Sequence, residues 1–511
     1  MSRQGLDVVQ ILVSLAAVGL VVVGWRWRRN AGRDRKLTGA WLVLAVIAAL
    51  AHYRFSLDAI VRSYDSYDLV HYYLNAKYFR ELGYTRLYQA CVVADMEGRN
   101  RFGSFVSIRD LYDQKVRGPS ALEEIREHPE RVKRRFSAGR WREFVRDFRV
   151  LDSRLRKRTW RRILVDRGYN ATPTWHLVGR SLASLVPASH LKWLCHLDTL
   201  LVALMFLAVA RVYGLRAMAI GVTWLGISFS THWPGVGWAL LRYDWLAASI
   251  AAACLVRKER WATAGALLGY ATLVRVFPGV LLLGMFVKGA HTLLAERKLD
   301  RGAVRMAAGF LAVVLLGGAL TWRVLGREHF DAFRHDLEVQ LAPENLSVNR
   351  MGVAIALAYR GETSAQELGS GGRPARYAAA GRMGPARTAI GLVALALLAV
   401  SFFPRRSPLP ARRDDDLTQL GFLGFGLLLT ASFYYWTLRV AMVVLHARHA
   451  ALSRWDAIGL AVLFGLEAYS AVFELAFEFR YGLTASLSLL VSLYCLGVCV
   501  IRFRAARRCA D

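Results

Sequence analysis

The sequence predicts an all-α polytopic membrane protein with about 11–13 transmembrane helices, and three observations support this class. Of the 511 residues, 55% are hydrophobic and 12% are aromatic, which is more apolar than a single soluble core. The apolar residues gather in segments close to the roughly 17–25 residues that span a bilayer. The charged residues, which give a net charge of +30, lie mostly in short connections or in one long segment. This distribution indicates membrane topology and contact with anionic lipids, and no nucleic-acid partner is expected.

The predicted spans are 7–24, 38–54, 190–210, 216–231, 236–256, 261–274, 277–290, 303–325, 387–403, 418–434, 437–451, 457–475 and 481–501, and several are short. We predict that 261–290 is a hairpin turning at Arg275–Pro278, because proline helps to break a helix. A single helix there would place the basic connection 288–305 on the wrong side of the membrane.

The spans and the hydrophilic segments between them divide the chain into five parts. These are 1–54 with the first two spans, a long hydrophilic loop 55–188, a central bundle 189–325, a second loop 326–386 and a C-terminal bundle 387–511. The short basic connections all fall on one side, which the positive-inside rule makes cytoplasmic. We therefore expect a multi-pass protein of the inner (plasma) membrane with both long loops in the periplasm or outside.

The rest of the chain is organised around the stretch from Tyr64 to Tyr88, directly after the second span. Asp65 and Asp68 open it, and aromatic side chains follow at helical spacing until Gly83 stops the pattern. Aromatic side chains favour the membrane–water interface. We predict an interfacial helix with carboxylates at its start, and the alternative is a surface helix that the two Asp residues cap.

A basic insertion of residues 95–175 forms the middle of the first loop. Trp141, Phe144, Val145, Phe148 and Leu151 recur at helical spacing with Arg between them. This pattern is typical of a basic amphipathic helix that lies on lipid headgroups, and also of one packed on its own domain.

Several ionisable residues lie in or beside predicted spans. Arg242 and Asp244 fall near the end of one span, Arg275 lies at the tip of the hairpin, and His232 lies in a short connection. Charges at this depth often mark a functional site, and an Arg can bind phosphate with its planar fork. The alternatives are a structural Arg242–Asp244 pair, Arg275 reaching to headgroups, and an interfacial His232.

The cysteines show no metal-binding spacing and mostly fall in apolar segments. We expect free thiols and no metal site built from them: Cys91, Cys195, Cys254, Cys495, Cys499 and Cys509.

Several of these stretches, in this order, resemble the GT-C superfamily of integral membrane glycosyltransferases, and most closely glycosyltransferase family 87. The similar stretches are Asp68-x-x-x-Tyr72 with Gly83 and Leu87-Tyr88, Arg242–Asp244, Arg275–Pro278, Asn345–Gly352 and Ser432–Leu445. The chain departs from the family in its larger and more basic insertion. It also has Leu438-Arg439 where the family usually has a His.

The resemblance implies a GT-C-like fold and an inverting transfer of a sugar from a polyprenyl phosphate donor on the outer face of the membrane. An Asp would act as the general base: Asp68, with Asp65 second. Arg275 and Arg242 would bind the donor phosphate, with Asp244 orienting Arg242. Further candidates are Tyr72, His232, Asn345 and Asn349. The expected partners are the lipid-linked donor, anionic lipids and an acceptor that is a glycan, a lipid or a protein. No cofactor beyond the donor is implied, and a divalent metal stays open.

Two other function classes share part of this pattern. A transporter or lipid flippase has many spans and buried charges, but such proteins commonly consist of two matching halves, and no such repeat is visible. A ligase or polymerase of surface polysaccharide would place Arg and His in a late outer loop. His329, Arg334 and His335 keep that class open.

Overall fold

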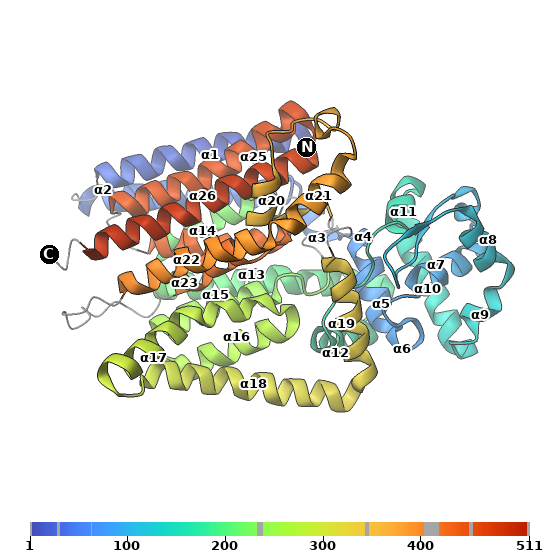
Figure 1. The fold of residues 1–511 in the computed structure, drawn as a ribbon. Coiled ribbons are helices and arrows are strands. Elements are labelled where there is room, and N and C mark those ends of the chain that lie inside the picture. The colour runs from blue at the N-terminus through green and yellow to red at the C-terminus, as the bar shows by residue number, and fades with distance from the viewer. Residues whose placement is uncertain are drawn as a thin grey trace.

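The computed structural model describes residues 3–27, 31–62, 64–231, 239–342, 347–402, 418–448 and 453–507. These residues form helices almost throughout, and the described strands are two antiparallel pairs of two residues each. Figure 1 shows a bundle of long helices with a smaller helical domain at one end. We call residues 57–187 the head and the helices of the next paragraph the bundle.

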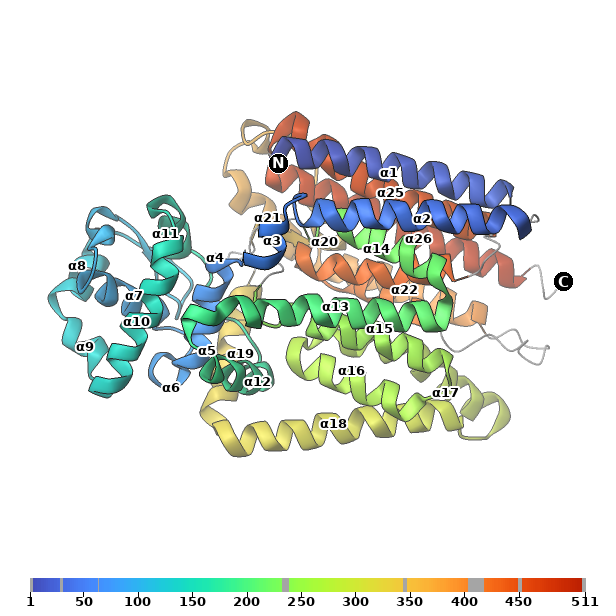
Figure 2. The ribbon, with the colours of Figure 1, turned by 180° about the vertical axis from the view of Figure 1, so that it is seen from behind.

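The bundle is built from helices of both halves of the chain that run side by side (Figures 1 and 2). They are α1 (Arg3–Arg26), α2 (Ala31–His52), α13 (Leu191–Tyr213), α14 (Leu215–Ile227), α15 (Asp244–Arg257), α16 (Trp261–Arg275), α17 (Leu283–Glu296), α18 (Arg301–Leu325), α22 (Gly384–Phe402), α23 (Thr418–Leu428), α24 (Val440–Ala447), α25 (Arg454–Phe477) and α26 (Arg480–Arg507).

Seven of the described helical stretches are long and apolar enough to cross a membrane, or up to eight if a bent pair counts as one span. The chain is therefore a multi-pass, all-α membrane protein. The bent pair joins α21 (Gly372–Arg382) to α22 at an angle of 48°. Among the described residues, the number of full-length spans is smaller than the predicted 11–13, because α14, α15, α16, α23 and α24 contain only 8–15 residues. At 1.5 Å per residue, even 15 residues extend only about 22 Å, less than the roughly 30 Å of a hydrocarbon core.

The segment 261–290 is broken as the proline predicted. Helix α16 ends at Arg275, Val276 adopts a φ of 61°, and a 3₁₀ turn, η4 (Phe277–Leu282), leads into α17. Figure 2 shows that the chain reverses there and runs back through α17 to the start of α18.

The head contains short helices and the strand pair β1 (Ile108–Arg109) and β2 (Val116–Arg117). Its helices are α3 (Leu57–Arg62), α4 (Ser66–Leu69), the π-helical turn η1 (Val70–Leu74), α5 (Asn75–Lys77), α6 (Phe79–Leu82), α7 (Leu87–Met96), η2 (Arg101–Ser104), α8 (Pro119–Glu127), α9 (Pro129–Lys133), α10 (Ala138–Arg154), α11 (Lys157–Ile163) and α12 (Pro173–Leu185). The turn η3 (Ala188–His190) joins the head to α13.

The stretch from Tyr64 to Tyr88 differs from the predicted interfacial helix. It is broken into α4, η1, α5 and α6 and ends at Gly83, whose φ is 57°. Its aromatic side chains are buried by protein: Tyr73 and Tyr78 are fully covered. The aromatic pattern therefore reflects a protein core at the junction of head and bundle. The N-cap at Asp65 agrees with the alternative prediction, in which Asp residues cap the helix.

Helix α10 also corrects a prediction. Its apolar face packs inside the head, where Phe144 and Leu151 are fully buried and Phe148 is 2% exposed. The apolar face is not available to lipid, so the prediction of a helix lying on headgroups is wrong and the alternative of packing on its own domain holds.

The second loop returns the chain from the bundle to the junction. It contains α19 (Arg327–Leu341), β3 (Arg350–Met351), α20 (Val353–Ala358), η6 (Gln366–Leu368) and α21. Strand β3 pairs with β4 (Ala431–Ser432), which precedes the 3₁₀ turn η8 (Phe433–Arg439). Helix α19 runs between the head and the bundle in the view of Figure 1. The five described cysteines, Cys91, Cys195, Cys254, Cys495 and Cys499, are buried free thiols.

Candidate active site at the junction of head and bundle

Asp65 and Asp68 lie where the head meets the bundle. Asp65 is the N-cap of α4, because its Oδ1 accepts hydrogen bonds from the backbone N–H groups of Tyr67 (2.9 Å) and Asp68 (3.3 Å). Asp68 therefore stands in the first turn of α4, and only 5% of it is exposed. The π-helical turn η1 follows at once, and such turns frequently occur at functional sites.

Asp68 faces Arg242 across the junction. Its Oδ2 lies 3.4 Å from Nε of Arg242, and each side chain is 7% exposed. Burial raises the pKa of Asp68 to about 7, the positive charge of Arg242 opposes this rise, and the negative charge of Asp65 adds to it. A carboxylate that titrates near neutral pH is suited to accept a proton in a reaction.

Arg242 is held from both its backbone and its side chain. The carboxylate of Asp198 on α13 accepts hydrogen bonds from the backbone N–H groups of Arg242 (2.9 Å) and Tyr243 (3.0 Å). The guanidinium carbon lies 4.4 Å from the ring centre of Tyr72 and 5.2 Å from that of Tyr434. Its Nη1 has no hydrogen-bond partner among the described residues, so this nitrogen retains capacity to bind an anion.

Arg275 lies at the same end of the bundle, at the last position of α16. Its Nη2 donates to the carbonyl of Leu241 (3.3 Å), and its guanidinium lies 5.6 Å from the ring centre of Trp175. Trp175 donates its indole N–H to the same carbonyl (3.2 Å). Arg275 therefore fixes the segment that carries Arg242.

Asp244 lies close to Arg242 in the chain, but no hydrogen bond or ion pair between their side chains occurs in the described residues. It begins α15, where it accepts hydrogen bonds from the backbone of Trp245 (2.8 Å) and from the hydroxyl of Tyr270 (2.9 Å). The carboxylate of Asp198 holds the backbone of Arg242, and that of Asp68 pairs with its side chain.

Tyr72 connects the site to helix α19 through a chain of hydrogen bonds. Its hydroxyl donates to Oδ1 of Asn170 (2.6 Å), and Nδ2 of Asn170 donates to Gln340 (3.3 Å). Nε2 of Gln340 donates to the buried carboxylate of Asp336 (2.9 Å). Burial raises the pKa of Asp336 to about 7. A helix of the second loop thus supports the ring that stacks on Arg242.

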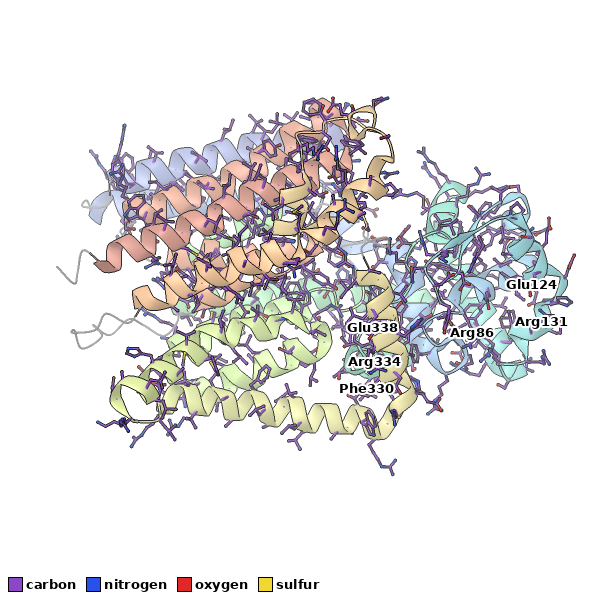
Figure 3. The ribbon with its side chains drawn as sticks, viewed as in Figure 1. Arg86, Glu124, Arg131, Phe330, Arg334 and Glu338 are labelled. Carbon is purple, nitrogen blue, oxygen red and sulfur yellow. The ribbon has the colours of Figure 1, made fainter. Side chains whose placement is uncertain are left out.

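Helix α19 also carries the three residues that kept the ligase class open, His329, Arg334 and His335, and they do not converge. Figure 3 shows Phe330, Arg334 and Glu338 in a row along the helix. Arg334 is exposed and pairs with Glu338 (3.9 Å). His329 stacks against Phe79, and His335 lies 3.1 Å from the carbonyl of Tyr112. Within the described part of the chain, His329, Arg334 and His335 make no contact with Asp68 or Arg242.

Asn349 lies on the bundle side of the junction, beside strand β3. Its backbone carbonyl accepts from the N–H of Phe433 (2.7 Å), and its Oδ1 accepts from Nε of Arg480 (3.4 Å). These contacts position the turn η8 that carries Tyr434. The candidates His232 and Asn345 lie outside the described residues.

An apolar cavity of about 260 Å³ opens beside the site. It lies between α2, α13 and α14, and Asp198 and Tyr243 line its polar end. Its remaining walls include Ala49, Val202, Ala203, Phe206, Val222 and Leu225. The sequence analysis gives no signal for a cavity in this place, because its walls come from three separate spans.

No group of three or more His, Cys, Asp or Glu side chains placed to hold a metal ion occurs in the ranges that the structure describes. Among the buried polar atoms of the site, Oδ2 of Asp68 and Nη1 of Arg242 have no hydrogen-bond partner within those ranges.

The sequence analysis identifies Asp68, Arg242, Arg275 and Tyr72, which the structure brings together, but it misses several contributors. Asp198 carried a usable signal, since a carboxylate inside the predicted span 190–210 is unusual. The remaining ones, Asn170, Asp336, Gln340 and Tyr434, lie far from Asp68 in the chain and carry no local pattern.

Comparisons with protein-family models, with curated proteins and with solved structures gave no match to this chain.

Proposed function

We propose that this protein is a membrane glycosyltransferase that moves a sugar from a polyprenyl phosphate donor to an acceptor at the junction of head and bundle, with inversion. The observation that carries the proposal is the buried pair of Asp68 and Arg242. It combines a carboxylate whose pKa is about 7 with a guanidinium that has donor capacity left. This is the combination that a transfer from a phosphate leaving group needs.

In the proposed reaction, Asp68 takes the proton of the acceptor hydroxyl while the hydroxyl oxygen attacks the anomeric carbon. The bond from that carbon to the phosphate oxygen breaks, and its electron pair leaves with the polyprenyl phosphate. Arg242 stabilises the negative charge that grows on the phosphate, and Arg275 keeps Arg242 in place through the carbonyl of Leu241.

The position of the site supports a lipid-linked donor over a soluble one. Asp68 and Arg242 lie at the end of the membrane bundle, and the apolar cavity that ends at Asp198 lies next to them. A prenyl chain in the bilayer would bring its phosphate to this level. The basic helix ends gather at the opposite end of the bundle, as in Arg26 and Arg257, which favours an outward-facing site.

The test is sugar transfer from radiolabelled polyprenyl phosphate monosaccharides in membranes that contain the wild type, Asp68→Asn or Asp65→Asn. Asn is a good N-cap, so Asp65→Asn keeps the cap of α4 and serves as the matched control. We expect Asp68→Asn to insert normally and to lose transfer by at least roughly a hundredfold, with Asp65→Asn close to the wild type.

Transfer by Asp68→Asn at the wild-type rate would remove Asp68 as the base, and loss in Asp65→Asn alone would reassign that role. A wild-type protein that transfers none of a full set of polyprenyl phosphate sugars would contradict the proposal.

A further inference from the structure

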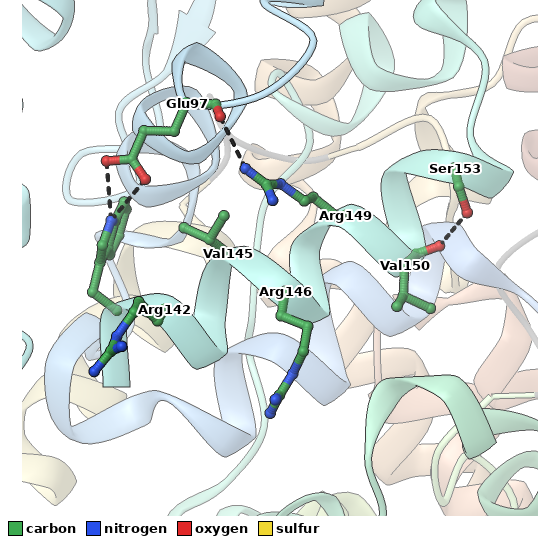
Figure 4. Close-up of a pocket in the computed structure, with 8 residues that line it drawn as sticks. Glu97, Arg142, Val145, Arg146, Arg149, Val150 and Ser153 are labelled. Carbon is green, nitrogen blue, oxygen red and sulfur yellow. Dashed lines mark hydrogen bonds between the residues drawn. The ribbon is translucent and has the colours of Figure 1, made fainter. Parts of the chain in front are cut away.

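Helix α10 exposes a row of arginines on the side of the head that faces solvent. Arg142, Arg146 and Arg149 follow at intervals of four and three residues and therefore share one face. They line a groove of about 630 Å³ together with Glu97, Trp141, Val145, Val150 and Ser153 (Figure 4). This volume lies in the range of sites that hold small organic ligands.

The three guanidinium groups have no carboxylate within 4 Å among the described residues. Arg142 donates to the backbone carbonyl of Ala138 (3.3 Å) and Arg149 to that of Glu97 (2.9 Å). The carboxylate of Glu97 is bound instead by the indole N–H of Trp141 (3.1 and 3.0 Å) and by Lys133. The groove is therefore strongly positive, and its guanidinium forks match carboxylate and phosphate groups.

Two features of the groove favour an anionic glycan as the occupant. Proteins bind single nucleic-acid strands through exposed aromatic rings on which the bases stack, but Trp141 in the groove is only 8% exposed and Phe144 is fully covered. An amphipathic helix binds firmly to a membrane surface by inserting its apolar face, but the apolar face of α10 packs inside the head. A polar, hydroxylated chain with carboxylate or phosphate groups needs neither.

The groove leads toward the candidate active site. Helix α10 continues from Ser153 to Arg154, whose guanidinium lies 4.2 Å from the ring centre of Tyr64. Tyr64 directly precedes Asp65, the cap of the helix that carries Asp68. From Arg142 to Arg154 the helix rises about 18 Å, and Arg154 lies about 100° around the helix from Ser153. A chain bound in the groove would therefore follow α10 for about 18 Å and turn around its side to reach the junction.

We propose that the basic face of α10 binds an anionic glycan, a chain bearing carboxylate or phosphate groups, and presents its end to Asp68 as the acceptor. The binding part of this inference stands on the groove, and the acceptor part rests on the proposed glycosyltransferase function. This proposal gives a role to the basic insertion of residues 95–175, which lies outside the proposed catalytic residues.

The test is binding of the full-length protein in detergent to polygalacturonate, with neutral dextran as the reference polymer. Arg142→Ala/Arg146→Ala removes two groove charges, and Arg117→Ala/Arg131→Ala removes two charges elsewhere on the head. Arg131 lies beside Glu124 on a different part of the head (Figure 3). We expect the wild type to prefer polygalacturonate, and the groove variant to bind it at least roughly tenfold more weakly. The control variant should keep nearly full affinity.

Equal weakening in both double variants would show attraction to net charge alone and would overturn the site. Equal binding of dextran and polygalacturonate by the wild type would also overturn the proposed glycan site. Loss of binding to phosphatidylglycerol vesicles in the groove variant, with unchanged polygalacturonate binding, would reassign the face to lipid. Groove-dependent binding without any sugar transfer by the wild type would retain the glycan site and remove the glycosyltransferase.

Discussion

At the residue scale, the protonation of Asp68 decides what the site can do. Burial raises the pKa of this carboxyl to about 7, so it is half protonated near neutral pH. A general base acts only when it is deprotonated. We therefore expect kcat/KM for transfer to fall about tenfold for each pH unit below 7 and to level off above it. A pH–rate profile in membranes measures this, and a profile that is flat from pH 5 to 8 would contradict the role of Asp68.

The same raised pKa predicts a pH-dependent effect on stability. Because folding raises the pKa of Asp68 above its ordinary value of 3.8, the folded state holds this proton more tightly than the unfolded state. The contribution of Asp68 to stability is thus complete below about pH 4 and is lost as the pH rises through about 7. Asn at this position does not titrate. The Tm of the wild type minus that of Asp68→Asn, measured in detergent, should decrease from pH 5 to pH 8. A constant difference would show that Asp68 is not buried as the structure places it.

Asp198 offers a second test at this scale. Its two carboxylate oxygens accept the N–H groups of Arg242 and Tyr243. In Asp198→Asn, an amide NH₂ replaces one of the two carboxylate oxygens. The backbone N–H group that faces it would lose its hydrogen-bond acceptor, at a cost of about 1–3 kcal/mol. We expect a lower Tm together with reduced transfer. Asp110→Asn, an exposed carboxylate of the head, should leave both unchanged, and an effect as large in that control would argue against a specific role of Asp198.

At the element scale, helices α16 and α18 approach so closely that only glycine fits at two positions. A Cβ at Gly265 would lie 1.9 Å from the carbonyl oxygen of Met306, and one at Gly309 would lie 2.0 Å from that of Ala262. Small residues allow such contacts between membrane helices. Gly265→Ala or Gly309→Ala should therefore force the helices apart and destabilise the protein by about 1–3 kcal/mol.

Gly318→Ala is the matched control, because Gly318 also lies in α18 and a Cβ there would meet nothing within 4 Å. Thermal unfolding in detergent measures all three variants. If Gly265→Ala were as stable as Gly318→Ala, the close crossing of α16 and α18 would be wrong.

Elements that depend on local signals could be predicted from the sequence, and those that depend on a partner could not. The break after Arg275 and the stop at Gly83 follow from residues within one turn of the chain. The apolar face of α10 was also visible, but its partner was not, since lipid and a protein core favour the same spacing. Helix α15 begins at Asp244, directly after two residues whose N–H groups donate to Asp198, and Asp198 lies 44 residues upstream of Arg242.

At the scale of the whole molecule, the site exists only because distant parts of the chain meet. Tyr72 reaches Asn170 across 98 residues, and Asn170 reaches Gln340 across another 170. The head contributes Tyr72 and Asn170, the second loop contributes Gln340, and the bundle contributes Arg242, on which Tyr72 stacks. A single sequence shows that a residue such as Arg242 is unusual for an apolar segment. It does not show which distant residues contact one another in the folded protein.

The arrangement of the whole molecule predicts which surfaces each side of the membrane can reach. The head lies at one end of the bundle, and the connection between α17 and α18 lies at the other (Figure 2). Arg131 is exposed in the head, and Arg297 is exposed in that connection. The described cysteines are buried, so they give a low background for thiol labelling.

By the positive-inside rule, the end with Arg297, Lys298 and Arg301 should face the cytoplasm. Arg131→Cys should therefore react with a membrane-impermeant maleimide in intact cells, or in spheroplasts where an outer membrane blocks access. Arg297→Cys should react only after permeabilisation. The opposite result would place the head and Asp68 in the cytoplasm, where polyprenyl phosphate sugars displayed on the outer leaflet could not reach them. Labelling of both sites in intact cells would contradict the separation of head and connection by a membrane-spanning bundle.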